Sequence, residues 1–115
     1  MTIQFTTTPI EGATLFTTTP IEGGATLIEF EIDGGVCWPA DLATLNPPEV
    51  DGTKGVVISG RGPVWLYAAL AHHYHVTAWV GTFDPRLGGA VVTSRHSPSA
   101  PAVGTVVEIP KTVPE

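Results

Sequence analysis

The sequence predicts an α/β fold, with a mixed β-sheet and two helices in one domain. The apolar run 55–59 is typical of a central strand that is covered on both faces. It is followed by an Ala- and Leu-rich helix, predicted from Pro63 to about Tyr74, and then by an apolar segment over 76–83. A strand, a helix and a second strand in this order predict a parallel pair joined by a crossover helix. The 13 glycines and 11 prolines in 115 residues exclude a long helical bundle.

The first 27 residues contain a near-exact duplication. Residues 5–15 recur as residues 16–27, with one added glycine at Gly24. Two copies are too few for a stacked solenoid. Only the second copy runs directly into a strand, so we expect residues 1–25 to add an extended arm or an edge hairpin. We therefore place the functional domain at residues 26–110 and treat the duplication as dispensable for chemistry.

Local patterns assign the remaining elements. The second half of residues 26–32 alternates apolar and acidic side chains, which predicts a half-buried strand. Pro39 suits the first position of a short helix, which Asn46-Pro47-Pro48 must stop. The last predicted elements are a turn over 84–89, a strand over 90–95, a loop over 97–104, a strand over 105–109, and a tail or linker over 111–115.

Composition favours a protein of the cytoplasm. No stretch approaches the roughly 20 apolar residues that cross a bilayer, and the N-terminus lacks the pattern of a secretory signal. The single cysteine, Cys37, cannot form an internal disulfide and is expected to be a small buried residue. No membrane partner is therefore expected.

Charge is unevenly distributed along the chain. The net charge of −6 argues against a protein that coats long nucleic acid, so no DNA partner is expected. Residues 52–107 nevertheless hold four basic residues and one acidic residue, together with all four histidines. This segment favours a small anionic ligand, although chance clustering in a short chain gives the same pattern.

The junction between the buried strand and the long helix is the first candidate site. Its glycines, Gly60 and Gly62, let backbone N–H groups turn outward beside the positive end of a helix. Ser59 adds a hydroxyl, and Arg61 adds a guanidinium suited to phosphate or to stacking on a base. The alternative is a Gly-rich turn with a solvated arginine.

Histidines form the second candidate site. His72 and His75 share a face if the helix persists that far, and His96 follows a predicted strand. Imidazoles with a carboxylate suit a divalent metal, whereas histidines near a helix C-terminus also simply complement the helix dipole.

The predicted hairpin separates these groups. Asp84 and Arg86 lie at its tip, on the same sheet edge as the glycine junction, while His75 and His96 lie at its open end. Strands of about six residues separate the ends by roughly 20 Å. Two subunits stacked head to tail would bring both sets onto one ligand. The alternative for Asp84 and Arg86 is a plain turn.

Three aromatic residues could stack on bases, but packing is favoured because they lie inside regular elements: Trp65, Tyr67 and Trp79.

Four strings in order carry a family resemblance: Gly55 to Leu66 (GVVISGRGPVWL), Leu70 to His75 (LAHHYH), Phe83 to Gly88 (FDPRLG), and Ala90 to His96. Over about residues 26–110 the chain resembles the small manganese-dependent "Csx-three" family of ring nucleases from type III CRISPR systems. Residues 1–25 have no counterpart. The additional glycine at Gly88-Gly89 lengthens the hairpin turn.

The resemblance implies a Rossmann-like fold and cleavage of cyclic tetra-adenylate, which would switch off type III CRISPR signalling. It implies dimers that stack head to tail, into tetramers or filaments, around the ring. The residues implied to bind ligand are Ser59, Gly60, Arg61 and Gly62, and those implied to be catalytic are His75, Asp84, Arg86 and His96. Mn²⁺ would be held by His75, Asp84 and His96, with His72 as a further candidate.

Two other functions remain open at this point. One is a manganese-dependent exonuclease that removes adenylates from RNA 3′ ends. The other is a module that senses cyclic oligoadenylate without cutting it.

Overall fold

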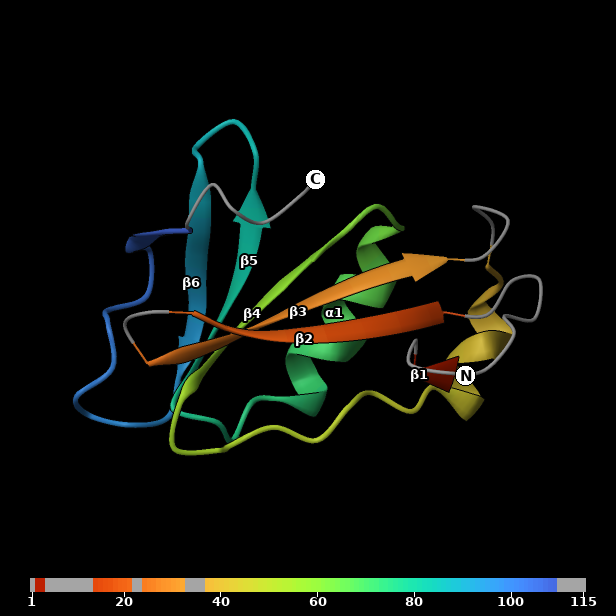
Figure 1. The fold of residues 1–115 in the computed structure, drawn as a ribbon, viewed down its shortest axis with the longest axis horizontal. Coiled ribbons are helices and arrows are strands. Elements are labelled where there is room, and N and C mark those ends of the chain that lie inside the picture. The colour runs from red at the N-terminus through yellow and green to blue at the C-terminus, as the bar shows by residue number, and fades with distance from the viewer. Residues whose placement is uncertain (1, 4–13, 22–23, 33–36, 110–115) are drawn as a thin grey trace.

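A computed structural model describes residues 2–3, 14–21, 24–32 and 37–109. It contains one seven-stranded sheet in which the strands lie side by side in chain order (Figure 1). The strands are β1 (Thr2–Ile3), β2 (Thr14–Ile21), β3 (Ala25–Ile32), β4 (Gly55–Gly60), β5 (Trp79–Asp84), β6 (Gly89–Arg95) and β7 (Val106–Glu108). The helices are η2 (Pro39–Thr44), a 3₁₀ helix, and α1 (Val64–His73).

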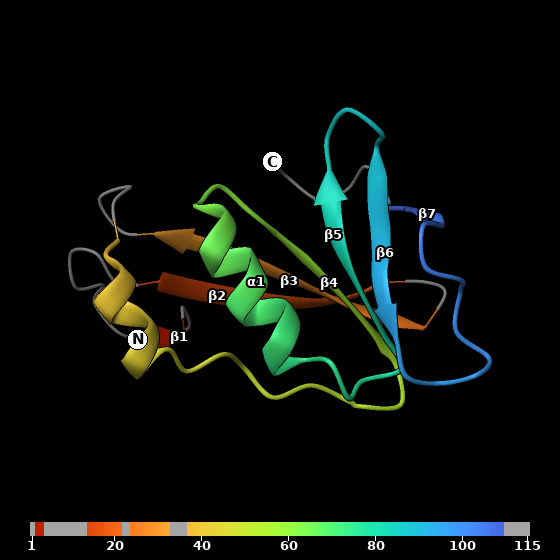
Figure 2. The same ribbon diagram turned by 180° about the vertical axis from the view of Figure 1, so that it is seen from behind.

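The centre of the sheet is parallel. β3 pairs with β4 and β4 pairs with β5 in parallel, while the β2–β3, β5–β6 and β6–β7 pairs are antiparallel. α1 connects β4 to β5 and lies across one face of the sheet (Figure 2). The predicted α/β class, mixed sheet, pair of helices and element order are confirmed; a Rossmann-like relationship stays a prediction.

The prediction for the start of β5 was wrong by three residues. The strand begins at Trp79 rather than at residue 76. Thr77 closes a turn instead, because both its N–H and its hydroxyl donate to the carbonyl of Tyr74, at 3.0 and 2.7 Å. Val76, in the same turn, remains exposed.

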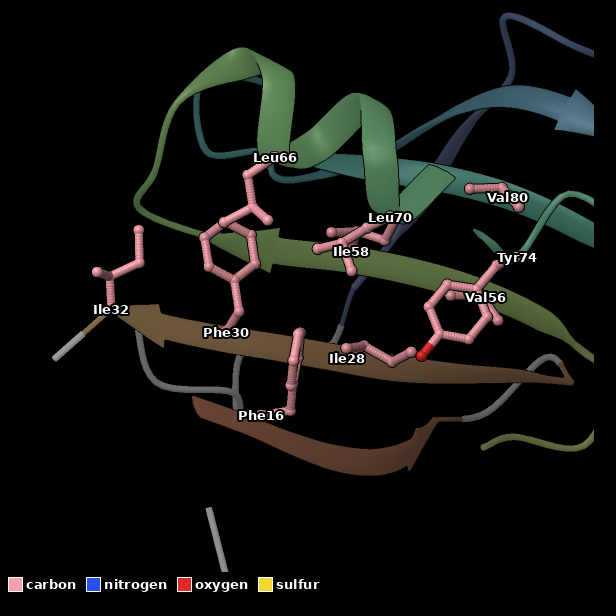
Figure 3. Close-up of a cluster of buried hydrophobic side chains, with 10 residues drawn as sticks. All are labelled: Phe16, Ile28, Phe30, Ile32, Val56, Ile58, Leu66, Leu70, Tyr74 and Val80. Carbon is pink, nitrogen blue, oxygen red and sulfur yellow. The ribbon is translucent and has the colours of Figure 1, made fainter. Parts of the chain in front are cut away.

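The larger core lies between α1 and the sheet (Figure 3). Leu66 and Leu70, four residues apart on α1, are fully buried against side chains of the central strands. The buried residues of this cluster are Phe16, Ile28, Phe30, Ile32, Val56, Ile58, Leu66, Leu70, Tyr74 and Val80. This packing fixes α1, and hence its first turn, relative to the carboxyl end of β4.

A second core covers the opposite face of the sheet. Trp79 is its largest member and packs so closely over Gly55 that a Cβ there would come within 2.1 Å of the indole. Trp65 and Tyr67 are partly buried against the first core. Packing roles are therefore confirmed for all three aromatic residues.

The second copy of the duplication is part of the sheet. β2 pairs with β3 over its full length, and Phe16 is fully buried in the first core. The boundary that we expected after residue 25 thus falls inside the β2–β3 hairpin. Most of the first copy, together with the tail over 111–115, lies outside the described residues.

Cys37 is half-buried rather than fully buried, and it packs at the edge of the first core. Burial and the nearby Asp41 carboxylate raise the pKa of its thiol. In the part of the chain that the structure describes, no helix is long and apolar enough to cross a membrane.

Candidate functional site

The carboxyl ends of β4 and β5 emerge at the same edge of the sheet. β4 and β5 pair only from Val56 to Ile58 and from Val80 to Thr82. Beyond this short ladder the two strands diverge, as both views show (Figures 1 and 2). The segments 59–62 and 84–86 therefore stand at one edge, as predicted, on separate arms of the twisted sheet.

Strand alternation puts two of the predicted residues on different faces. Ser59 shares the face of Val57, which belongs to the core opposite α1, whereas Asp84 shares the face of Val80, which packs under α1. Ser59 lies beside Glu29 of β3 in the parallel register. Glu29 was not predicted as part of this edge, because its strand neighbour depends on pairing between distant segments.

Packing explains the two glycines of the β4–α1 loop. A Cβ on Gly60 would lie 2.6 Å from the Phe30 carbonyl oxygen, and a Cβ on Gly62 would lie 2.8 Å from the Phe30 ring. Real Cβ atoms do not approach other atoms so closely. Glycine is therefore required here by the close passage of the loop over Phe30.

The main-chain groups of Gly60 have a protein partner. The Gly60 N–H donates to the Tyr67 hydroxyl at 2.9 Å, and this hydroxyl donates to the Gly60 carbonyl at 2.5 Å. The Gly60 amide, which we predicted to bind ligand, is thus engaged within the protein. The exposed residues of the loop are Arg61 and Gly62.

α1 begins immediately after this loop. Pro63 is its N-cap residue, and its carbonyl accepts from the N–H groups of Leu66 and Tyr67. Arg61 is therefore an exposed residue of the loop that leads directly into the positive end of the helix dipole. This pairing suits an anionic ligand.

Asp84 and Arg86 form a tight turn at the end of β5. The Arg86 guanidinium lies 3.1 Å from the Asp84 carboxylate, which also accepts the Arg86 backbone N–H at 2.9 Å. These two hydrogen bonds lower the pKa of Asp84, and the carboxylate in turn raises the pKa of Arg86. The Arg86 side chain is 87 % exposed, compared with 25 % for Asp84, so the guanidinium can turn toward a ligand.

The histidines lie at the opposite end of the β5–β6 hairpin. His96 follows β6 directly, and its N–H donates to the carbonyl of Ala78, just before β5. His75 lies three residues before Ala78 and is exposed, as is His96. Because β6 runs antiparallel to β5, Arg95 pairs with Trp79 at this end and Gly89 with Asp84 at the other. The two ends are about 17 Å apart along the strand.

The orientation of His75 is fixed by one contact. Its Nδ1 lies 2.8 Å from the carbonyl oxygen of His72. Because a carbonyl oxygen only accepts, Nδ1 carries the proton, and the neutral imidazole keeps its lone pair on Nε2. His75 can therefore accept a proton or bind a metal through Nε2.

The imidazole rings of His72 and His75 are stacked. The ring centroids are 5.2 Å apart and the planes are nearly parallel, at 7°. Because the lone pair of an imidazole lies in the plane of its ring, two stacked parallel rings do not aim their lone pairs at one ion. Across the described residues, no three His, Cys, Asp or Glu side chains come together as a metal site. The predicted ligands His75, Asp84 and His96 thus do not meet within one protomer.

A second arginine, Arg95, belongs to the histidine end. It donates to the carbonyls of Pro98 and Ala100, both at 3.3 Å, and so holds the loop that follows His96. Its place in the sequence gave no sign of this role, because the acceptors are main-chain atoms of an irregular loop.

Comparison with known proteins gives one family. Residues 29–108 match the family described as CRISPR-associated protein (Cas_csx3). The chain is also 53 % identical over 74 residues to an uncharacterized protein of Aquifex aeolicus (strain VF5). That match covers 61 % of this chain and 66 % of the relative, just under two thirds of its length. The carboxyl edge of the sheet (residues 59–62 and 84–86) lies within the matched residues 29–108. The histidine end of the β5–β6 hairpin (His75 and His96) also lies within them.

Proposed function

Because this chain belongs to the CRISPR-associated Cas_csx3 family, we propose that it is a metal-dependent phosphodiesterase that cleaves cyclic tetra-adenylate. Cleavage would remove this small cyclic RNA as a signal in type III CRISPR defence. The protein would act as dimers that stack head to tail, so that one ring lies between the carboxyl edge of one protomer and the histidine end of the next.

The observation that carries this proposal is the separation of the two sets of polar groups. Asp84 and Arg86 lie at one end of β5, and His96 lies beyond the other end, with about 17 Å of strand between them. A single phosphodiester cannot contact both. A head-to-tail arrangement makes the two ends face each other and completes the site across an interface.

Ligand binding would use the basic groups of the carboxyl edge. Arg61 is exposed beside the start of α1, and Arg86 is exposed at the tip of the hairpin. The ends of β4 and β5 diverge, so these two guanidiniums suit a ligand with several phosphates better than a single phosphate ion. Ser59 and Gly62 would complete the contacts on the same edge.

Proton transfer would use the partner protomer's histidine end. In the neutral imidazole form, with its proton on Nδ1, His75 would accept the proton of the attacking oxygen at Nε2; this oxygen is either a ribose 2′-hydroxyl or a water. The oxygen–phosphorus bond would form as the bond to the leaving ribose oxygen breaks, and His96 in its imidazolium form would donate a proton to that oxygen. Arg86 would stabilise the negative charge that develops on the phosphoryl oxygens.

The candidate side chains are of types that bind a divalent ion, but they do not come together within one protomer. Imidazole nitrogens and a carboxylate are ligands that suit Mn²⁺, and the candidate set is Asp84 from one protomer with His75 and His96 from its neighbour. Because the Nε2 lone pair of His75 serves one role at a time, this residue would either bind the ion or accept the proton. When bound, such an ion would supply Lewis-acid stabilisation of phosphoryl charge. Since Asp84 is already ionised in its turn with Arg86, metal binding would displace no proton from it.

Thin-layer analysis of radiolabelled cyclic tetra-adenylate tests the proposal. We expect linear products with Mn²⁺ and none with EDTA, and we expect Asp84→Ala to abolish turnover while the ring still binds. Asp51→Ala is a matched control, because Asp51 is likewise an aspartate whose hydrogen bonds stay in its own turn, to Thr53. This variant should cleave like the wild type.

Two results would replace the proposal with one of the alternatives. Trimming of linear oligoadenylate RNA with no attack on the ring would identify a 3′ exonuclease. Tight binding of the ring without cleavage, with or without Mn²⁺, would identify a sensing module.

A further inference from the structure

The Tyr67 hydroxyl links the end of β4 to the first turn of α1. It accepts the Gly60 N–H at 2.9 Å and donates to the Gly60 carbonyl at 2.5 Å. One side-chain oxygen thus satisfies both main-chain polar groups of a residue at the end of a central strand. The segment between the two residues contains the loop that carries Arg61.

The Tyr67 ring is itself held in place. It packs edge-on against Phe30 of β3, with ring centroids 5.2 Å apart and an interplanar angle of 73°. Phe30 also lies directly beneath Gly60 and Gly62, where it leaves no room for a Cβ. The loop is therefore clamped between the Phe30 ring below it and the hydroxyl bonds of Tyr67.

We propose that Tyr67 is a positioning residue, whose hydroxyl holds the loop of residues 60–62 in the conformation that presents Arg61 to an anionic ligand. This inference rests on the proposed function for the identity of the ligand, but not for the role of the hydroxyl in the loop. Tyr67 acts through Gly60 and Arg61, and no bond to the ligand is assigned to it.

Removal of the hydroxyl has a defined consequence. Without it, the N–H and carbonyl of Gly60 lose a partly buried partner, and the loop gains access to other conformations. Only a fraction of molecules would then present Arg61 correctly, and the apparent affinity for the ligand falls in proportion to that fraction. The chemical step on bound ligand would be unaffected, because it uses other residues.

The test compares Tyr67→Phe with Tyr74→Phe. Tyr74 is a matched control at the other end of the same helix, where its buried hydroxyl donates to the Pro48 carbonyl at 2.5 Å. Both variants lose one oxygen atom and one anchoring hydroxyl, so a general loss of stability affects both. Three quantities are measured: amide hydrogen exchange at Gly60 relative to Ile58, the Kd for cyclic tetra-adenylate in EDTA, and the single-turnover rate at saturating ring with Mn²⁺.

For Tyr67→Phe we expect relative exchange at Gly60 to rise about tenfold and Kd to weaken about tenfold, with the saturating rate unchanged within about twofold. For Tyr74→Phe we expect a lower Tm, with relative exchange at Gly60 and Kd at wild-type values. Wild-type exchange and affinity in Tyr67→Phe would overturn the inference, as would equal effects in the two variants.

A wrong ligand assignment would give different results from a wrong role for Tyr67. If the wild-type protein does not bind the ring, the ligand assignment is wrong. Exchange at Gly60 then decides the role of Tyr67 alone: a selective rise in Tyr67→Phe supports it, and no rise refutes it.

Discussion

The Arg86 guanidinium and the Asp84 carboxylate are 3.1 Å apart at the tip of the β5–β6 hairpin, in a turn where the backbone N–H of Arg86 also reaches the carboxylate. This geometry keeps Asp84 ionised and leaves most of the arginine exposed. It gives a carboxylate for a metal and a cation for phosphate within three residues. The same turn also explains the sequence Asp84-Pro85-Arg86 as local structure, so its contribution to chemistry must be tested by variants.

Arg86→Gln should raise the pKa of Asp84 toward the ordinary aspartate value. In metal-free wild-type protein, hydrogen bonds from Arg86 hold the pKa of Asp84 below the ordinary aspartate value. Because the pKa in the folded state lies below that in the unfolded state, Asp84 stabilises the fold above about pH 4, and this contribution is lost as pH falls through the folded-state value. Carbon-13 NMR titration of the Asp84 carboxyl group measures the shift directly.

A wild-type Asp84 that titrates at the ordinary aspartate value, or one that is unchanged in Arg86→Gln, would contradict the ion pair as described. Thr53→Ala provides a control, because it removes the hydroxyl partner of Asp51 in another turn and should leave the Asp84 midpoint unchanged.

Gly60→Ala should destabilise the protein by roughly 1–3 kcal/mol, because the added methyl group meets the Phe30 carbonyl and ring, and the backbone cannot easily yield. Gly52→Ala is the matched control. A Cβ on Gly52 has no atom within 4 Å, so the change in unfolding free energy should stay within about 0.5 kcal/mol. Urea denaturation of both variants checks the expectation. Equal stability of the two would show that the loop does not pass closely over Phe30.

Phe16→Ala should cost about 3–5 kcal/mol of unfolding free energy, because Phe16 is fully buried in the first core. Phe5 holds the equivalent place in the first copy of the duplication, so Phe5→Ala is the natural comparison. We expect Phe5→Ala to have a much smaller effect, since the second copy forms β2.

A mild effect of Phe16→Ala, combined with a severe effect of the double variant, would contradict this assignment. It would indicate that the two copies exchange places against β3.

Much of the fold follows from local sequence patterns. The apolar run 55–59, the helix after Pro63 and the turn at Asp84 each indicated its element correctly, because each pattern acts over a few residues. The place of β2 followed only in part, because local patterns predicted an extended arm or an edge hairpin over residues 1–25 without deciding between them. Its Thr-rich segment is identical in both copies, so local sequence does not indicate that Phe16 is buried or that β2 pairs with β3 over its full length. The start of β5 was missed because side-chain hydrogen bonds of Thr77 outweigh the apolar character of Val76.

The candidate site was predictable in outline. Parallel strands carry their carboxyl ends to one edge, so the glycine loop and Asp84 could be placed together from sequence. The hydrogen-bond, strand and stacking partners of the individual residues could not be predicted from the sequence. The bond from Gly60 to Tyr67, the neighbour relation of Glu29 and Ser59, and the stacking of His72 on His75 depend on strand register and rotamers.

A complementation assay tests the divided site most directly. Asp84→Ala and His75→Ala proteins, each inactive alone, are mixed in equal amounts and assayed on cyclic tetra-adenylate with Mn²⁺. In random head-to-tail stacks, one interface in four joins an intact carboxyl edge to an intact histidine end, so about a quarter of wild-type activity should return. No recovery, although both variants bind the ring and assemble together, would contradict a site shared between protomers.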